Sequence, residues 1–273
     1  MQQFTTHVVE RPEAAVAYRV SLPLSRDRRG ILVVIHGHSR SPALAEAFAD
    51  TAAREGVVLL VPFFDIEEFD DFQILRGTAG PRAAADALNA VCEDVGRRFD
   101  LAPRPIALVG FSGGAQFAHR YAMCFPQRVA ALVSASAGWY TMPDAYVGFP
   151  YGLAASADMP EGIQYLDDFL RLPVRVMVGE NDSRRDGSLR ASALIDETQG
   201  QTRLERANAW VQAIRTVASC RGLAPAISIE ILPGSGHSVD QAIRKGGLVW
   251  RSVSFLRSQW GPETHDESVE ASD

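Results

Sequence analysis

The most informative signal of the fold is one short stretch, Leu108-Val109-Gly110-Phe111-Ser112-Gly113-Gly114-Ala115. The apolar run before Gly110 predicts a buried strand, and the small residues after Ser112 lead into a predicted helix. Gly110, Ser112 and Gly114 fit the pattern G-x-S-x-G, a strand-to-helix turn that holds a reactive serine at the end of a sheet. Such a turn strains the serine backbone, so the residues two positions away must be small. The stretch therefore predicts that Ser112 is a nucleophile, and the alternative is an incidental serine in a Gly-rich loop.

The length and composition favour one large globular domain. The chain has 273 residues, of which 47% are hydrophobic and 22% charged, as in ordinary globular proteins. A net charge of −6 argues against nucleic acid as the main partner. The three cysteines form no CxxC motif and suit a reducing compartment. Without a recognisable signal peptide or a long apolar run, we expect a cytoplasmic protein with no membrane contact.

Strands and helices alternate along the chain, which predicts an α/β fold with a mostly parallel sheet and helices on both faces. The expected strands cover 14–22, 31–35, 57–61, 106–109, 129–134, 174–178 and 227–232, the first and last of them near sheet edges. The expected helices cover 42–55, 81–99, 116–125, 201–221 and 239–258. We expect a single domain over 1–260, with a small cap-like insertion at about 138–172, and a disordered acidic tail over 261–273.

Polar residues follow several of the expected strands. Because the carboxyl ends of parallel strands share one edge of the sheet, we expect Ser112, Asp182 and His237 to lie close together. A serine hydroxyl needs a base to take its proton and a carboxylate to orient that base. His237, in a Gly-rich loop, is the expected base, and Asp182 is the expected acid. Asp186 is an alternative acid if its loop folds back.

These residues, in this order on alternating strands, resemble the α/β-hydrolase superfamily. Within it, the chain is similar to the esterase and polyhydroxyalkanoate-depolymerase-like branch, and the resemblance covers about 14–258. The resemblance implies the α/β-hydrolase fold, a small-molecule ester substrate, hydrolysis through an acyl-serine, and no cofactor. The residues that carry it are Gly110, Ser112 and Gly114 of the turn, His36-Gly37, Asp182 and His237.

An enzyme of this kind needs hydrogen-bond donors for the developing oxyanion, each contributing about 3–4 kcal/mol when preorganised. The first expected donor is the backbone N–H of Gly113, which follows the nucleophile at a helix N-terminus. The segment His36-Gly37-His38 resembles the His-Gly-x segment of the same fold, so the second expected donor is the main chain of His38.

Metal binding and substrate contacts are less strongly indicated. His36 and His38 form a His-x-His pair, but the next residues offer no further ligand, so we expect no metal. The aromatic residues Phe111, Trp139 and Tyr140 are expected to wall a substrate pocket, and ordinary packing is the alternative for each.

Three functions are open at this point. The first is a carboxylic-ester hydrolase, and the second is a serine peptidase or amidase that uses the same three residues. The third is a catalytically silent binding protein, against which the complete set of three residues argues. The residues do not identify the natural substrate or the oligomeric state, so a homo-oligomer stays open.

Overall fold

The strands at the centre of the protein are apolar on both sides because both of their faces are covered. The computed structural model describes residues 2–25 and 28–260. In β3 (Gly30–Ile35) all six residues are buried. Ile31, Val33 and Ile35 belong to one hydrophobic core, and Leu32 and Val34 to a second core on the opposite face. The side chains of a strand alternate between the two faces of its sheet, so this strand is hydrophobic throughout.

Within the described residues, eight strands form one sheet in the order β1-β2-β4-β3-β5-β6-β7-β8. The other strands are β1 (Thr5–Val9), β2 (Val16–Ser21), β4 (Val57–Phe63), β5 (Ile106–Phe111), β6 (Val129–Ala135), β7 (Val174–Gly179) and β8 (Ile227–Leu232). β2 is antiparallel to both of its neighbours, and all pairs from β4 to β8 are parallel. The chain winds outward in opposite directions from β3 and β5. Ligand sites of open parallel sheets lie at this kind of switch point, at the carboxyl ends of the strands.

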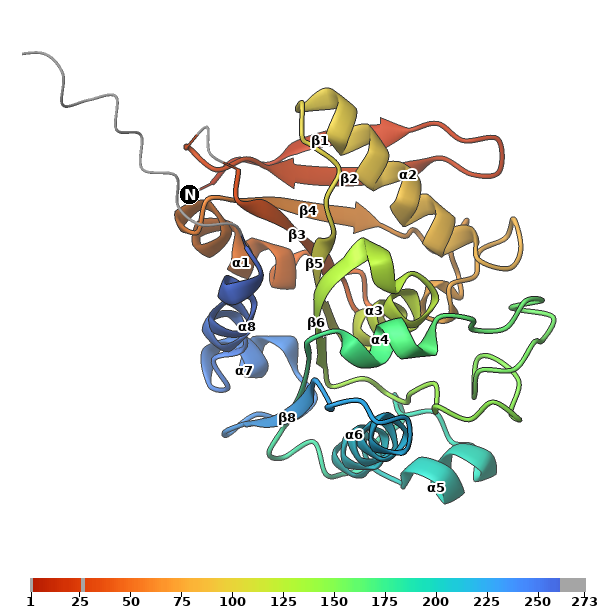
Figure 1. The fold of residues 1–273 in the computed structure, drawn as a ribbon. Coiled ribbons are helices and arrows are strands. Elements are labelled where there is room, and N and C mark those ends of the chain that lie inside the picture. The colour runs from red at the N-terminus through yellow and green to blue at the C-terminus, as the bar shows by residue number, and fades with distance from the viewer. Residues whose placement is uncertain (1, 26–27, 261–273) are drawn as a thin grey trace, which may run out of the picture.

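Helices cover both faces of the sheet (Figure 1). One face carries α1 (Ala43–Arg54), α7 (Val239–Arg244) and α8 (Leu248–Leu256). The other carries α2 (Ala83–Arg98), α3 (Gly113–Cys124), α4 (Leu166–Arg171) and α6 (Arg203–Cys220), and α5 (Ala193–Gln199) packs against α6. Short 3-10 turns are η1 (Phe72–Ile74), η2 (Pro126–Arg128) and η3 (Arg257–Gln259). The predicted α/β class, with a mostly parallel sheet between two helical layers, is confirmed.

Three details of the sequence-based prediction are wrong. β1 was not expected and forms one edge of the sheet, with β2 next to it near that edge, and β8 is the other edge strand as predicted. The short α5 was not expected either. The helix expected over 239–258 is broken into α7 and α8, because Gly247 has a left-handed φ of 67° that ends the helical path. β1 escaped prediction because its residues are mostly exposed or half-buried, which weakens the apolar alternation.

The segment expected to be a cap, 138–172, contributes Tyr140, Phe149 and Leu153 to the main core and ends in α4. Its role as a cap stays a prediction, and the expected acidic tail over 261–273 lies outside the described residues. In the described part of the chain, no helix has both the length and the apolar character needed to cross a bilayer.

Candidate active site

Ser112 lies in a strained turn between β5 and α3. Its φ of 55° and ψ of −115° are unusual for a residue with a side chain, and such strain is commonly retained at functional sites. The glycines on either side make the turn sterically feasible. A Cβ atom on Gly110 would lie 2.2 Å from the carbonyl oxygen of Gly114, and one on Gly114 would lie 2.3 Å from that of Ile35. The G-x-S-x-G pattern therefore reflects close backbone packing at both glycines.

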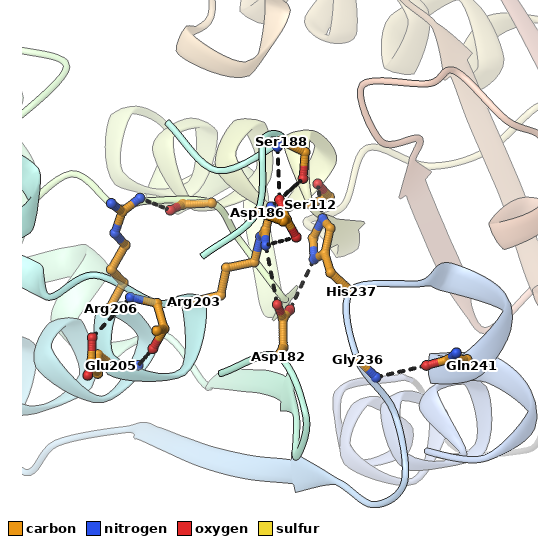
Figure 2. A network of polar contacts seen from close by, with 12 residues as sticks. Ser112, Asp182, Asp186, Ser188, Arg203, Glu205, Arg206, Gly236, His237 and Gln241 are labelled. Atoms are coloured by element: carbon orange, nitrogen blue, oxygen red, sulfur yellow. Dashed lines mark hydrogen bonds and ion pairs between the residues drawn. The ribbon is translucent and has the colours of Figure 1, made fainter. Parts of the chain in front are cut away.

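The three residues predicted to act together meet at the carboxyl ends of their strands. The Oγ atom of Ser112 is 3.0 Å from Nε2 of His237, and Nδ1 of His237 is 3.0 Å from Oδ2 of Asp182. Figure 2 shows the imidazole between the hydroxyl and the carboxylate. The Asp182 side chain is 1% exposed and that of His237 is 15% exposed. The arrangement can pass a proton from the hydroxyl to an imidazole that a buried carboxylate orients.

Asp186, the alternative acid, has a different partner. Its carboxylate accepts from the side chain and the amide of Ser188 and from Nη1 of Arg203 (Figure 2). These hydrogen bonds, that of the Ser188 hydroxyl first, hold the pKa of Asp186 well below its usual range. The structure therefore places Asp182, and not Asp186, against the imidazole.

The loops that carry Asp182 and His237 are bonded to each other. The amide of Asn181 donates to the carbonyl of Ser235 (2.9 Å), and the amide of Gly234 donates to the carboxylate of Glu180 (2.9 Å). The side chain of Gln241 accepts from the amide of Gly236 at 2.9 Å (Figure 2). The histidine loop is therefore fixed to the acid loop on one side and to α7 on the other.

The two expected oxyanion donors lie beside each other. A Cβ atom built on Gly113 would lie 3.1 Å from the backbone nitrogen of His38. Gly113 is the first residue of α3, where the N–H has no partner within the helix and the helix dipole favours negative charge. The backbone of Gly113 and the backbone nitrogen of His38 are therefore neighbours next to Ser112.

A buried histidine and a half-buried arginine hold the His38 loop. Nε2 of His36 accepts from the amide of Phe64 (3.0 Å), and its Nδ1 donates to the carbonyl of Gly37 (2.9 Å). Burial lowers the pKa of His36 to about 4, so the imidazole is neutral. Arg40 donates to the carbonyls of His38 (3.0 Å) and Phe64 (2.6 Å). The loop is thus tied to the segment that follows β4.

The prediction that Phe111, Trp139 and Tyr140 wall a pocket is wrong for Tyr140. Its ring is fully buried and stacks on Trp210 with centroids 4.6 Å apart, deep in the core. Phe111 is 6% exposed and lies behind His237, with ring centroids 5.5 Å apart. Trp139 is 2% exposed. Large aromatic residues after buried strands fill the layer beneath the site, because burying them contributes most to packing.

Both ring nitrogens of His36 form the hydrogen bonds described above, so this histidine of the His-x-His pair has no free nitrogen to bind a metal ion. In residues 2–25 and 28–260, no group of three or more His, Cys, Asp or Glu side chains is placed to hold a metal ion.

One important residue was missed by sequence reasoning. Arg203, at the start of α6, is 1% exposed and donates to Asp182 (3.3 Å), Asp186 (3.2 Å) and the hydroxyl of Ser188 (2.8 Å). The local signal is the capping box of Thr202 and Glu205, which fixes the first turn of this helix. The box could have located the helix start, but not the carboxylates that Arg203 reaches.

The fold is similar to that of several solved hydrolases. One is poly(aspartic acid) hydrolase-1 from Sphingomonas sp. KT-1, with 25% identity, a TM-score of 0.78, and coverage of 91% of this chain and 99% of that one. The poly(3-hydroxybutyrate) depolymerase of Bordetella parapertussis has 22% identity, a TM-score of 0.74, and coverage of 92% and 94%. An S-formylglutathione hydrolase from Staphylococcus aureus has 13% identity, a TM-score of 0.60, and coverage of 94% and 97%.

No protein-family model matches the sequence, and no curated protein matches it. The likeness is therefore one of structure. The mostly parallel eight-stranded sheet, its two helical layers and these neighbours show that the chain has the α/β-hydrolase fold.

Proposed function

We propose that this protein is a serine hydrolase that cleaves carboxylic esters through an acyl-serine intermediate. The observation that carries the proposal is the continuous hydrogen-bonded row from Ser112 through His237 to Asp182, with both links at 3.0 Å. The solved neighbours named above include an ester-polymer depolymerase, which supports ester hydrolysis. No cofactor enters the proposed reaction.

In the proposed reaction, Oγ of Ser112 bonds to the carbonyl carbon while Nε2 of His237 takes the hydroxyl proton. The carbonyl π electrons move to the oxygen, which then accepts hydrogen bonds from the amides of Gly113 and His38. The tetrahedral intermediate collapses, and the alcohol leaves with the proton from His237. Water then repeats the sequence on the acyl-serine and releases the carboxylic acid. Asp182 orients the imidazole and stabilises its charged form.

A serine amidase is the second candidate, because amide cleavage passes through the same kind of intermediate. It is favoured by one specific likeness, to a hydrolase named for poly(aspartic acid), whose units are linked by amide bonds. A catalytically silent binding protein is the third and weakest candidate, because it would have no use for the strain at Ser112.

A fluorophosphonate probe and two substrate panels test the proposal. We expect the probe to label the wild type and the Ser258→Ala control, in which an exposed serine far from the site is removed, but not Ser112→Ala. A panel of p-nitrophenyl esters and a panel of aminoacyl anilides then separate esterase from amidase, and we expect turnover of the esters. Equal labelling of the wild type and Ser112→Ala would eliminate the serine mechanism. Turnover of the anilides alone would favour the amidase.

A further inference from the structure

Two guanidinium groups lie on the ring of Trp139, four residues after the end of β6. The guanidinium carbon of Arg120 lies 4.0 Å from the centre of the Trp139 ring, and that of Arg190 lies 5.6 Å from it. Arg120 is fully buried, whereas Arg190 is exposed. Tyr151 stacks on the same indole at 5.0 Å, and its hydroxyl accepts from Nη2 of Arg190 (3.2 Å). The buried guanidinium of Arg120 and the exposed guanidinium of Arg190 therefore both lie against the ring of Trp139.

No acidic side chain balances these charges. Among the described residues, no Asp or Glu forms an ion pair with Arg120 or with Arg190. Arg120 donates to Thr141 and to two backbone carbonyls, and its Nη2 is buried without a partner. Burial, and after it the charge of Arg190, lowers the pKa of Arg120. An unbalanced buried cation beside a second cation is costly, and a bound anion would offset that cost.

The backbone around Arg190 is fixed by a further buried arginine. Arg206 is fully buried and bonded to Asp196 (2.7 Å). Its guanidinium also donates to the carbonyls of Gly138 (2.7 Å), Arg190 (3.1 Å) and Gly200 (2.9 Å). Gly138 precedes Trp139, so Arg206 ties the Trp139 segment to the Arg190 segment. A binding group whose backbone is held in this way loses less entropy when it engages a ligand.

This cluster borders the nucleophile through Gln116. Gln116 lies one helical turn after Ser112, about 5.4 Å along α3, and its amide donates to the carbonyl of Ser112 (3.1 Å). Nε2 of Gln116 is 3.0 Å from the position that a Cβ atom of Gly138 would take, and a methyl carbon of Leu189, the residue before Arg190, is 3.9 Å from it. Gln116 therefore lies between the turn that carries Ser112 and the segments that carry Trp139 and Arg190.

We propose that Arg190, with Arg120 behind the Trp139 ring, binds a carboxylate group of the substrate beside Ser112, so that the enzyme prefers esters with a free carboxylate. The inference rests on the proposed function and narrows its substrate class. Arg190 contacts the carboxylate directly, and a guanidinium matches the two oxygens of a carboxylate in geometry. Arg120 acts as a positioning residue that adds positive charge from beneath the indole.

The test uses mono-p-nitrophenyl esters of glutaric, adipic and suberic acid. The neutral partner of each is the methyl p-nitrophenyl diester of the same length, and the rate with Ser112→Ala is subtracted as background. For at least one chain length, we expect the wild type to have a kcat/KM about tenfold higher for the acid than for its diester, mainly through a lower KM. Arg190→Gln should lose this preference with little change for the diesters, and Arg190→Lys should keep part of it.

The matched control is Arg184→Gln, which removes an exposed positive charge from the same loop and should leave the preference for the acids unchanged.

A binding measurement does not depend on turnover. Calorimetry of adipate with Ser112→Ala should show a dissociation constant about tenfold lower than with the Ser112→Ala, Arg190→Gln double variant. The inference is overturned if the wild type shows no preference at any length, or if Arg190→Gln binds adipate equally well. Serine-dependent cleavage of the diesters without a preference for the acids would contradict the inference and leave the proposed function intact. No ester cleavage at all would refute the proposed function, and the calorimetry would then show whether Arg190 binds a carboxylate.

Discussion

Arg203 and Asp182 form a buried ion pair, with Nη1 of the arginine 3.3 Å from Oδ1 of the aspartate and both side chains 1% exposed. The other oxygen of Asp182 lies 3.0 Å from His237 (Figure 2). The carboxylate is thus held from two sides, by a permanent cation and by the imidazole that it orients. Arg203 does not contact the hydroxyl of Ser112, so it is a positioning residue of the proposed site.

Arg203→Met should destabilise the protein and lower kcat. The change leaves the negative charge of Asp182 buried with a single partner, which costs about 3–5 kcal/mol in comparable buried pairs. The free energy of unfolding from urea denaturation should fall by about that amount. KM should change little, because Arg203 lies behind the carboxylate. Arg215→Met is the control and should cost about 1 kcal/mol, because Arg215 lies on the same helix and its hydrogen bonds within residues 2–25 and 28–260 go to the carbonyl of Ile227. Equal stability of the two variants would contradict the role given to Arg203.

Asp182→Asn and Asp186→Asn should differ strongly in activity. Of the two carboxylates, Asp182 is the one that is hydrogen-bonded to the imidazole, and an amide in its place would favour the wrong tautomer of His237. We expect kcat to fall by about 10³–10⁴-fold for Asp182→Asn and by less than about tenfold for Asp186→Asn. Steady-state hydrolysis of a p-nitrophenyl ester measures both. A larger loss for Asp186→Asn would mean that Asp186 is the functional acid.

His36 should make stability depend on pH between about 4 and 6.5. Burial lowers the folded-state pKa of His36 to about 4, whereas the unfolded chain has an ordinary value near 6.5. In that window the unfolded state binds a proton that the folded state does not. The stability due to the neutral imidazole is therefore complete above pH 6.5 and is lost as the pH falls toward 4.

The measurement is the slope of the unfolding free energy against pH, from urea denaturation of the wild type and of His36→Gln. One proton corresponds to about 1.4 kcal/mol per pH unit, so the wild-type slope should exceed that of the variant by up to this amount. Burial also lowers the pKa of His119, but His119 is present in both proteins, so its contribution cancels in the difference between the two slopes. Identical slopes would show that His36 does not titrate in this way.

Gly114→Ala should disrupt the turn at Ser112. The added methyl group would lie 2.3 Å from the carbonyl oxygen of Ile35 and 2.5 Å from that of His36, so the His38 loop must move. We expect a loss of about 2–3 kcal/mol in stability and loss of ester hydrolysis, because the His38 amide is displaced from its place beside Gly113. Gly187→Ala is the matched control, since nothing lies within 4 Å of its Cβ position. Wild-type activity in Gly114→Ala would argue against the proposed oxyanion site.

Some features followed from short-range rules. The turn at Ser112 could be predicted because its pattern of small residues is local, and Gly110 is required by its close contact with Gly114, four residues away. The buried strands could be predicted because a strand covered on both faces must be apolar throughout, as β3 is. The meeting of Ser112, Asp182 and His237 could be predicted because parallel strands deliver their carboxyl ends to one edge.

The fold class, the strained turn and the three residues that meet at the sheet edge could all be predicted from the pattern of residues along the chain. Tertiary structure alone decided that Asp182 rather than Asp186 faces His237, that Arg203 holds both carboxylates, that Tyr140 lies in the core, and that Arg120 and Arg190 share one indole. The reason is physical. The periodicity of apolar residues and the close contact between Gly110 and Gly114 depend on residues that are near in the chain. Burial and ion pairing depend on where loops that are far apart in the sequence come to lie.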